Sequence, residues 1–280
     1  MPRIGKMDLP RLMESFWTDD KCRAYLEDLR WPQGVRCPRC ASDKIARVRS
    51  RRQYDCSSCR YRFSVTVGTI FHDSHLPLWK WFAAVALMVH AEKGISSSQL
   101  QRALGIADKT AWYLTHRIRA AMRDDSRLPL EGVVETDATS INTSGDAGPP
   151  IVDGIVAVRA SERDGDLRTR GGRGRAATAA IVESLVRLAV SERAEPPDPG
   201  PHAHADTIEN AWSVLKRSIL ASHHKLSTKH LPAYLDEFIF RFKGRKNPYL
   251  FRDTLLRLIG EEPLKYTELT QAEGPSPPHP

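Results

Sequence analysis

The 280-residue sequence lacks any long uninterrupted run of apolar residues. Its longest candidate, residues 81–89, is about half the ~18 residues that indicate a transmembrane helix, so we expect no membrane span. The first eight residues also lack the basic-then-apolar pattern of a secretory signal, which predicts a cytoplasmic protein. A composition that is 41% hydrophobic and 27% charged excludes wholesale disorder. A chain of this length can form two compact domains.

Acidic residues are scarce in the N-terminal half of the chain. Residues 1–130 hold 23 Lys and Arg against 13 Asp and Glu, a net charge of +10. Residues 131–280 hold 19 against 21, a net charge of −2. The whole basic excess therefore lies in the first half, which predicts that this half binds a polyanion. Basicity alone does not identify that polyanion.

Cysteine is scarce as well, but four of the five cysteines form two C-x2-C pairs separated by fifteen residues. This spacing suits four thiolates bound tetrahedrally to one zinc ion. Two disulfides are the alternative, which is disfavoured because the cytoplasm keeps thiols reduced. Four thiolates leave no open coordination position, so we expect a structural zinc ion. The predicted ligands are Cys37, Cys40, Cys56 and Cys59, whereas Cys22 is expected to be a packing residue.

The segment that this zinc ion would hold is strongly basic. Residues 36–62 contain nine Lys and Arg and only two Asp. Alternation over residues 46–54 predicts a half-exposed pair of strands from which several arginines project. A solvated charged face is the alternative, but this density of cations on a zinc ribbon favours contact with phosphates. The predicted DNA-contacting arginines are Arg36, Arg39, Arg47, Arg49, Arg51, Arg52, Arg60 and Arg62.

A second element typical of DNA-binding proteins follows the basic segment. A buried helix is predicted over residues 78–89, followed by helices over 96–104 and 108–122 that are joined by a short Gly-containing turn. Asp108 is expected to cap the last of these helices. This is the helix-turn-helix pattern, whose second helix can enter the major groove, and a helical hairpin without a DNA role is the alternative. The residues predicted to be available to DNA are Lys109, Thr110, Tyr113, Arg117 and Arg119.

Several motifs of this sequence resemble those of one protein family. They lie at residues 34–40, 54–60, 63–71, 77–81, 95–119, 207–217 and 227–242. Together they resemble the zinc-ribbon group of bacterial insertion-sequence transposases, called the ISXO2-like or IS1595 group, over roughly residues 15–260 except a central stretch. The resemblance implies a nucleoid-associated protein that binds double-stranded DNA at the terminal repeats of its element and at a target. It also implies a homodimer or higher oligomer on DNA.

The resemblance further implies a ribonuclease-H-like α/β domain that cuts and joins DNA with a pair of Mg²⁺ ions held by carboxylates. Residues 132–139, 151–158 and 166–170 are predicted to be strands and residues 176–190 a helix, the order in which such a domain begins. By resemblance, Asp137 is the first catalytic carboxylate, and Glu209 with Lys216 matches the acidic residue and lysine of the family signature. Asp206 lies one helical turn before Glu209, and the two residues also match a capping box. The implied catalytic residues are Asp137, Asp206, Glu209 and Lys216, with Asp137 and Glu209 as magnesium ligands.

No strand with a second catalytic Asp is found in the sequence. Residues 193–205 contain four prolines and no Val, Ile, Phe or Tyr, a composition that excludes a central strand because proline removes a ladder donor. We interpret this segment as an internal deletion. An active enzyme with a metal triad of Asp137, Asp206 and Glu209 is one hypothesis. A copy that binds DNA without cleaving it is the second, and a zinc ribbon that only docks proteins is the third.

The predicted fold class is a multidomain α/β protein. An N-terminal zinc ribbon and a helix-turn-helix precede a truncated ribonuclease-H-like domain. The expected boundaries are a helical segment at 1–33, the zinc ribbon at 34–72, the helix-turn-helix region at 73–128, the ribonuclease-H-like domain at 129–265, incomplete around 191–205, and a disordered tail at 266–280.

Overall fold

The computed structural model describes residues 9–91, 94–123, 134–141, 155–162, 167–173 and 228–271. The chain divides into two compact units. The first unit is made of three segments of the chain, residues 1–91, 97–122 and 246–280. The second unit contains residues 92–96 and 123–245. Residues 246–265, which we expected in the ribonuclease-H-like domain, therefore lie in the same unit as the zinc ribbon.

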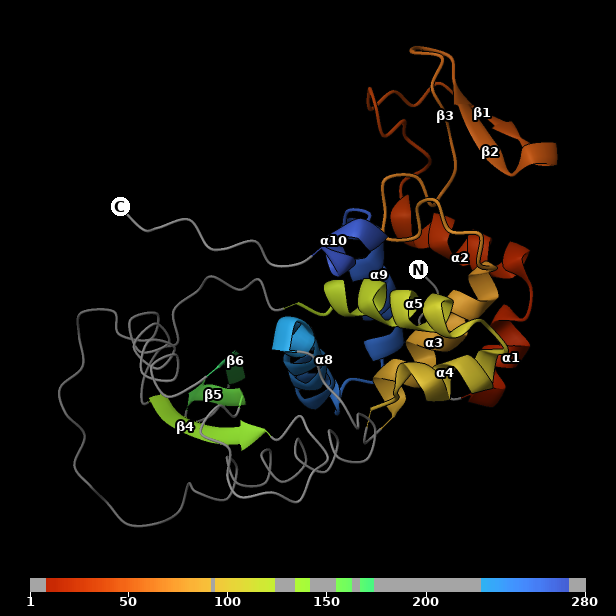
Figure 1. Cartoon of the computed structure of the whole chain (residues 1–280). Coiled ribbons are helices and arrows are strands. Elements are labelled where there is room, and N and C mark those ends of the chain that lie inside the picture. The colour runs from red at the N-terminus through yellow and green to blue at the C-terminus, as the bar shows by residue number, and fades with distance from the viewer. Residues whose placement is uncertain are drawn as a thin grey trace, which may run out of the picture. The chain divides into compact units, whose positions relative to one another are not determined.

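A body of helices forms most of the first unit (Figure 1). Its central helix is α3, which is apolar on all sides and has nine of its thirteen residues buried, as expected of a helix surrounded by others. The helices α1, α2, α4, α5 and α9 pack around it. No helix among the residues described is long and apolar enough to cross a membrane. The bounds are α1 Leu9–Phe16, α2 Asp19–Arg30, α3 Leu78–His90, α4 Ser97–Leu104, α5 Asp108–Ala120, α9 Leu250–Gly260 and α10 Tyr266–Thr270.

Aromatic side chains from distant parts of the sequence form the core of this body. The ring of Phe82 on α3 lies 4.9 Å from that of Phe16 and 5.8 Å from that of Phe251, measured between centroids. Tyr25 of α2 contacts Phe16 at 5.0 Å. Such pairs bury large apolar surfaces and add a specific ring geometry. The C-terminal helix α9 is therefore part of the same core as the first two helices of the chain.

The zinc ribbon of the first unit contains a small antiparallel sheet in the order β1-β2-β3. Its core consists of Cys37, Tyr54, Cys56 and Phe63, with Trp31 packed against it. The pair of strands predicted over residues 46–54 is confirmed, with a 3-10 turn, η1, between the strands. The bounds are β1 Ile45–Val48, η1 Arg49–Arg51, β2 Gln53–Cys56 and β3 Arg62–Phe63.

The helices α4 and α5 lie close to the positions predicted from the sequence. The prediction that Asp108 caps α5 is wrong, because Ala107 occupies the cap position and makes no side-chain hydrogen bond. Asp108 is instead the first residue of the helix. A negative charge in the first turn of a helix is favoured by the positive end of the helix dipole. The charge of Asp108 thus favours the same helix start without a capping hydrogen bond.

The second unit contains a three-stranded antiparallel sheet in the order β4-β5-β6, and α8 lies against β6. The three predicted strands are confirmed, although each ends two to four residues later than expected. The predicted helix at 176–190 and the proline-rich residues 193–205 lie outside the described part of the chain. The bounds are β4 Val134–Ile141, β5 Ile155–Glu162, β6 Leu167–Arg173, η2 Thr228–His230 and α8 Leu231–Gly244.

Candidate metal centre and nucleic-acid interface

The four cysteines of the two C-x2-C pairs converge on one point. All four Sγ atoms lie within 4.8 Å of one another, and the Cys37–Cys59 and Cys40–Cys56 pairs are each 3.6 Å apart. Four sulfurs bound to zinc at about 2.3 Å in a tetrahedron are about 3.8 Å apart, so the arrangement fits a zinc ion. The same distances exclude disulfides, whose sulfurs lie about 2.0 Å apart. All five cysteines are free. The cysteine cluster is therefore suited to hold a structural zinc ion.

Two turns of the same geometry present these sulfurs. Each turn ends in a residue with left-handed backbone, Ala41 with a φ of 58° and Arg60 with a φ of 57°. The N–H of Ala41 donates to the carbonyl of Cys37 at 2.8 Å, and that of Arg60 donates to Cys56 at 2.9 Å. The backbone N–H groups of Cys59 and then Ser58 also lower the pKa of the Cys56 thiol to about 6. A thiolate is the form that binds zinc, so the backbone prepares this ligand.

Cys22 lies apart from this cluster on α2. Its side chain is fully buried, and its thiol donates to the carbonyl of Phe16 at 3.2 Å. Burial is the main cause that raises the pKa of the Cys22 thiol to about 12. These contacts confirm the expectation of a packing residue.

The reactivity of Cys22 follows from this burial. Because thiolates and not thiols react with electrophiles, we expect Cys22 to resist alkylation at neutral and mildly alkaline pH. After zinc is chelated from the native chain, a thiol reagent should modify the four zinc-binding cysteines and spare the fifth until denaturant is added. Counting modified thiols by mass spectrometry with and without denaturant measures this, and five fast-reacting thiols in the native chain would contradict it.

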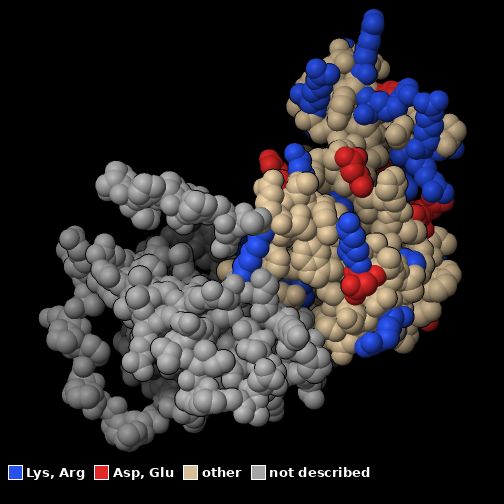
Figure 2. Space-filling model, viewed as in Figure 1, with Lys and Arg blue, Asp and Glu red and all other residues tan. Residues whose placement is uncertain are grey.

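The arginines predicted to contact DNA on the zinc ribbon are all exposed. Figure 2 shows basic side chains gathered over this part of the molecule. Three of the eight take part in ion pairs, of which Arg62 with Asp55 lies within the ribbon, at 2.6 Å. Phosphate binding requires exposed cations, so the position of all eight is compatible with the predicted role. The exposed set is Arg36, Arg39, Arg47, Arg49, Arg51, Arg52, Arg60 and Arg62.

On α5, the predicted DNA-contacting residues differ in exposure. Lys109 and Thr110 are exposed and Tyr113 is half-buried, but Arg117 and Arg119 are only 4% and 1% exposed. The prediction that these two arginines are available to DNA is therefore wrong. The physical reason is that the second half of α5 is covered on all sides, since residues 114–119 are all buried.

Arg117 has an alternative role inside the first unit. Its guanidinium donates to the carbonyl of Ile70 and, at 2.7 Å, to that of His72. The same group lies over the ring of Trp81 at 4.9 Å and over that of Tyr113 at 5.2 Å. Burial lowers the pKa of Arg117 from its ordinary value. Arg117 thus satisfies backbone carbonyls of the loop that leads from the ribbon to α3.

The C-terminal segment lies on the face of α5 that we expected to contact DNA. The ammonium of Lys109 is 4.5 Å from the ring centre of Tyr266, whose edge also meets Trp112. The hydroxyl of Tyr113 donates to the carbonyl of Leu264. Residues 266–270 form α10, so this stretch differs from the expected disordered tail. Sequence reasoning did not identify Tyr266, because its role depends on a contact across more than 150 residues.

Of the four residues implied in catalysis, one lies among the described residues. Asp137 lies in the middle of β4, opposite Arg159 of β5 in the antiparallel register. Asp206, Glu209 and Lys216 lie outside the described residues. Among the described residues, the only group of cysteines, histidines or carboxylates suited to a metal ion is the cysteine cluster of the ribbon.

Comparison with known proteins agrees with this architecture. Residues 17–62 match the transposase zinc-ribbon domain, and residues 180–243 match the ISXO2-like transposase domain. The second range includes Glu209 and Lys216. It begins at residue 180, after β6, so it does not include Asp137. No solved structure matches the chain.

A curated relative supports the same family. The chain is 30% identical over 162 residues to an uncharacterized protein in transposable element ISH50 of Halobacterium salinarum. The aligned part is 57% of this chain and 50% of the relative, so the chain spans about half the length of the relative it matches. The two matched ranges follow each other in the order zinc ribbon, then transposase domain. Over these two ranges, and over the part aligned with this relative, the chain is similar to insertion-sequence transposases.

Proposed function

We propose that this chain is the DNA transposase of an insertion sequence, and that it binds the ends of its element through the basic zinc ribbon. The observation that carries this proposal is the cysteine cluster, which has zinc-binding geometry and lies in a ribbon that carries eight exposed arginines. A zinc ion bound there supplies no chemistry, because four thiolates complete its coordination. The four cysteines instead hold the strands that carry the arginines.

The proposal includes a helix-turn-helix formed by α4 and α5. Because Arg117 and Arg119 are buried, DNA contact by α5 is limited to its N-terminal turn, where Lys109 and Thr110 are exposed. The first turn of a recognition helix is the part that commonly reaches base edges. We also propose double-stranded DNA at the terminal repeats and at the target as the partner, and a homodimer or larger assembly on that DNA.

For the chemical step, we propose a ribonuclease-H-like domain in which Asp137 and Glu209 hold Mg²⁺. Mg²⁺ held by these carboxylates would supply charge stabilisation for phosphodiester cleavage and strand transfer. Asp206 is the proposed third carboxylate, and Lys216 is proposed to contact a DNA phosphate. The three antiparallel strands of the second unit, with Asp137 on β4, are compatible with the start of such a domain.

DNA binding without cleavage is the second candidate function. The proline-rich residues 193–205 favour it, because they stand where a strand with the second catalytic Asp is expected. An Asp that bridges two Mg²⁺ ions has no simple substitute, since Mg²⁺ takes few protein ligands and these are mostly carboxylates.

A cleavage assay tests the two candidates. Purified zinc-loaded chain is incubated with DNA from both flanks of its own gene and with Mg²⁺ or Mn²⁺, beside the Asp137→Ala variant. The first proposal predicts metal-dependent cuts at the element ends that disappear in the variant. Specific binding with no cuts in either protein would assign the second function. Absence of specific binding would contradict both and support the protein-docking alternative.

A further inference from the structure

The hairpin tip of the zinc ribbon, defined as residues 47–52, contains four arginines within six residues. Arg47 lies in β1, Arg49 and Arg51 lie in η1, and Arg52 follows directly. All four side chains are exposed. The four arginines therefore have the same chemistry, location and access to solvent. They differ in whether they form an ion pair with a carboxylate.

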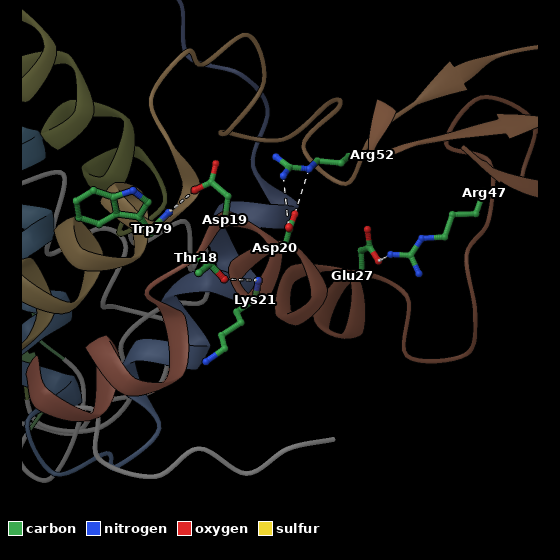
Figure 3. Close-up of polar contacts among 8 residues, drawn as sticks. All are labelled: Thr18, Asp19, Asp20, Lys21, Glu27, Arg47, Arg52 and Trp79. Carbon is green, nitrogen blue, oxygen red and sulfur yellow. Dashed lines mark hydrogen bonds and ion pairs between the residues drawn. The ribbon is translucent and has the colours of Figure 1, made fainter. Parts of the chain in front are cut away.

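Two of these arginines are paired with carboxylates of α2. The Arg47 guanidinium lies 3.1 Å from Glu27, and the Arg52 guanidinium lies 3.1 Å from Asp20 (Figure 3). Asp20 and Glu27 are seven residues apart, close to two turns of helix, so both lie on the same side of α2. The two ion pairs thus fasten the hairpin at two points along one helix face.

The α2 end of these contacts is held in place by further interactions. Thr18 begins the helix by accepting a hydrogen bond from the N–H of Lys21 at 3.4 Å, and Asp19 accepts one from the N–H of Trp79 at 3.2 Å (Figure 3). The Asp19 contact ties the first turn of α2 to α3. Asp20 therefore projects from a helix start that is anchored on both sides.

The ribbon end is held against α2 as well. The edge of Trp31, directly after α2, meets the ring of Tyr54 at 5.5 Å. Burial, followed by the hydrogen bond to Glu27, raises the pKa of Tyr54 to about 12. The match to the transposase zinc-ribbon domain begins at residue 17 and so includes α2. The helix α2 therefore packs against both the helical body and the ribbon, and the domain match extends to the N-terminal side of the expected boundary at residue 34.

The other two arginines of the tip have no such partner. Arg49 and Arg51 form neither an ion pair nor a side-chain hydrogen bond with any residue that the structure describes. Arg62, and more weakly the charge of Arg51, lower the pKa of Asp55, but the ion pair of Asp55 is with Arg62. The N–H of Arg52 donates to the carbonyl of Arg49 at 3.2 Å, so the backbone closes the turn without these side chains.

We propose that Arg49 and Arg51 contact DNA phosphates, whereas Arg47 and Arg52 are positioning residues that hold the ribbon on α2. This division rests on the proposed DNA binding of the ribbon. A free guanidinium that meets a phosphate displaces a condensed cation from the DNA, and this release makes affinity depend on salt. A guanidinium already neutralised by a carboxylate adds little to that release.

The test compares the salt dependence of binding among matched variants of the full-length, zinc-loaded chain. Affinity for a short random-sequence duplex is measured across salt concentrations for Arg49→Gln, Arg51→Gln, Arg47→Gln and Arg52→Gln. The first two variants should each reduce the slope of log affinity against log salt by about 0.9, the value for one phosphate contact. The last two should leave the slope unchanged. Asp20→Asn, which frees Arg52, should steepen it by up to about 0.9.

The outcomes test the different roles of the four arginines separately from the proposed function. A lower affinity at constant slope in Arg52→Gln, restored by Arg52→Lys, supports a positioning role. Equal losses of slope in all four variants would overturn the division while leaving DNA binding intact. An unsubstituted chain that does not bind duplex DNA would overturn the proposed function together with the division. Zinc content and far-UV circular dichroism show that each variant is folded.

Discussion

Removal of zinc is expected to unfold the ribbon and to abolish DNA binding. The ribbon strands are only two to four residues long, and two of the four buried residues in its core, Cys37 and Cys56, are themselves zinc ligands. Structural zinc contributes about 10–16 kcal/mol in small zinc-finger peptides, more than so small a core supplies. After chelation, amide hydrogen exchange should therefore lose protection over residues 35–63.

The helical body is expected to survive this treatment. Its core of Phe16, Phe82 and Phe251 contains no zinc ligand, so the amides of α3 should stay protected. Cys56→Ala should behave like the chelated chain, whereas Cys22→Ala should retain zinc and duplex binding. A ribbon that stays protected without bound metal would show that its apolar contacts suffice and that our account of the zinc site is wrong.

Arg117→Ala is expected to lower the free energy of unfolding of the first unit by about 3 kcal/mol, because it leaves the carbonyls of Ile70 and His72 without their donor. It also opens a cavity between Trp81 and Tyr113. Arg117→Lys keeps the charge but cannot donate to both carbonyls from a planar fork, so its loss should be intermediate. Urea denaturation followed by circular dichroism measures these values.

Arg102→Ala provides the matched control for this prediction. Arg102 is an exposed arginine on α4, and surface substitutions of this kind change stability by about 0.5 kcal/mol or less. If Arg117→Ala were as stable as the unsubstituted chain but bound DNA poorly, the original expectation of a DNA-contacting Arg117 would be restored.

The zinc ligands and the ribbon strands could be predicted from sequence because local spacing determines both. A C-x2-C pair needs only one turn to direct two thiolates at one metal, and alternation within a few residues indicates a strand. The same holds for α3, whose apolar run is long enough to indicate a buried helix. The signals in all three cases lie within the element itself.

The burial of Arg117 and the pairing of the hairpin arginines could not be predicted in this way. Arginine is mostly exposed in proteins, and the carbonyls that receive Arg117 lie more than 40 residues away. The carboxylates of Asp20 and Glu27 are 32 and 20 residues from their partners. The sequence alone therefore predicts the same role, contact with DNA, for all of these arginines. Their tertiary contacts show that they differ in burial and in ion pairing.

The position of α9 in the core of the first unit has a consequence for synthesis of the protein. Phe251 packs on Phe16 at 6.1 Å between ring centroids, and the carbonyl of Leu258 accepts a hydrogen bond from the N–H of Ile70. A chain that is still being translated, or one that stops before residue 250, leaves this side of α3 without its cover. The first unit thus completes its core only after residues 250–260 have left the ribosome, and products that stop before residue 250 lack this part of the core.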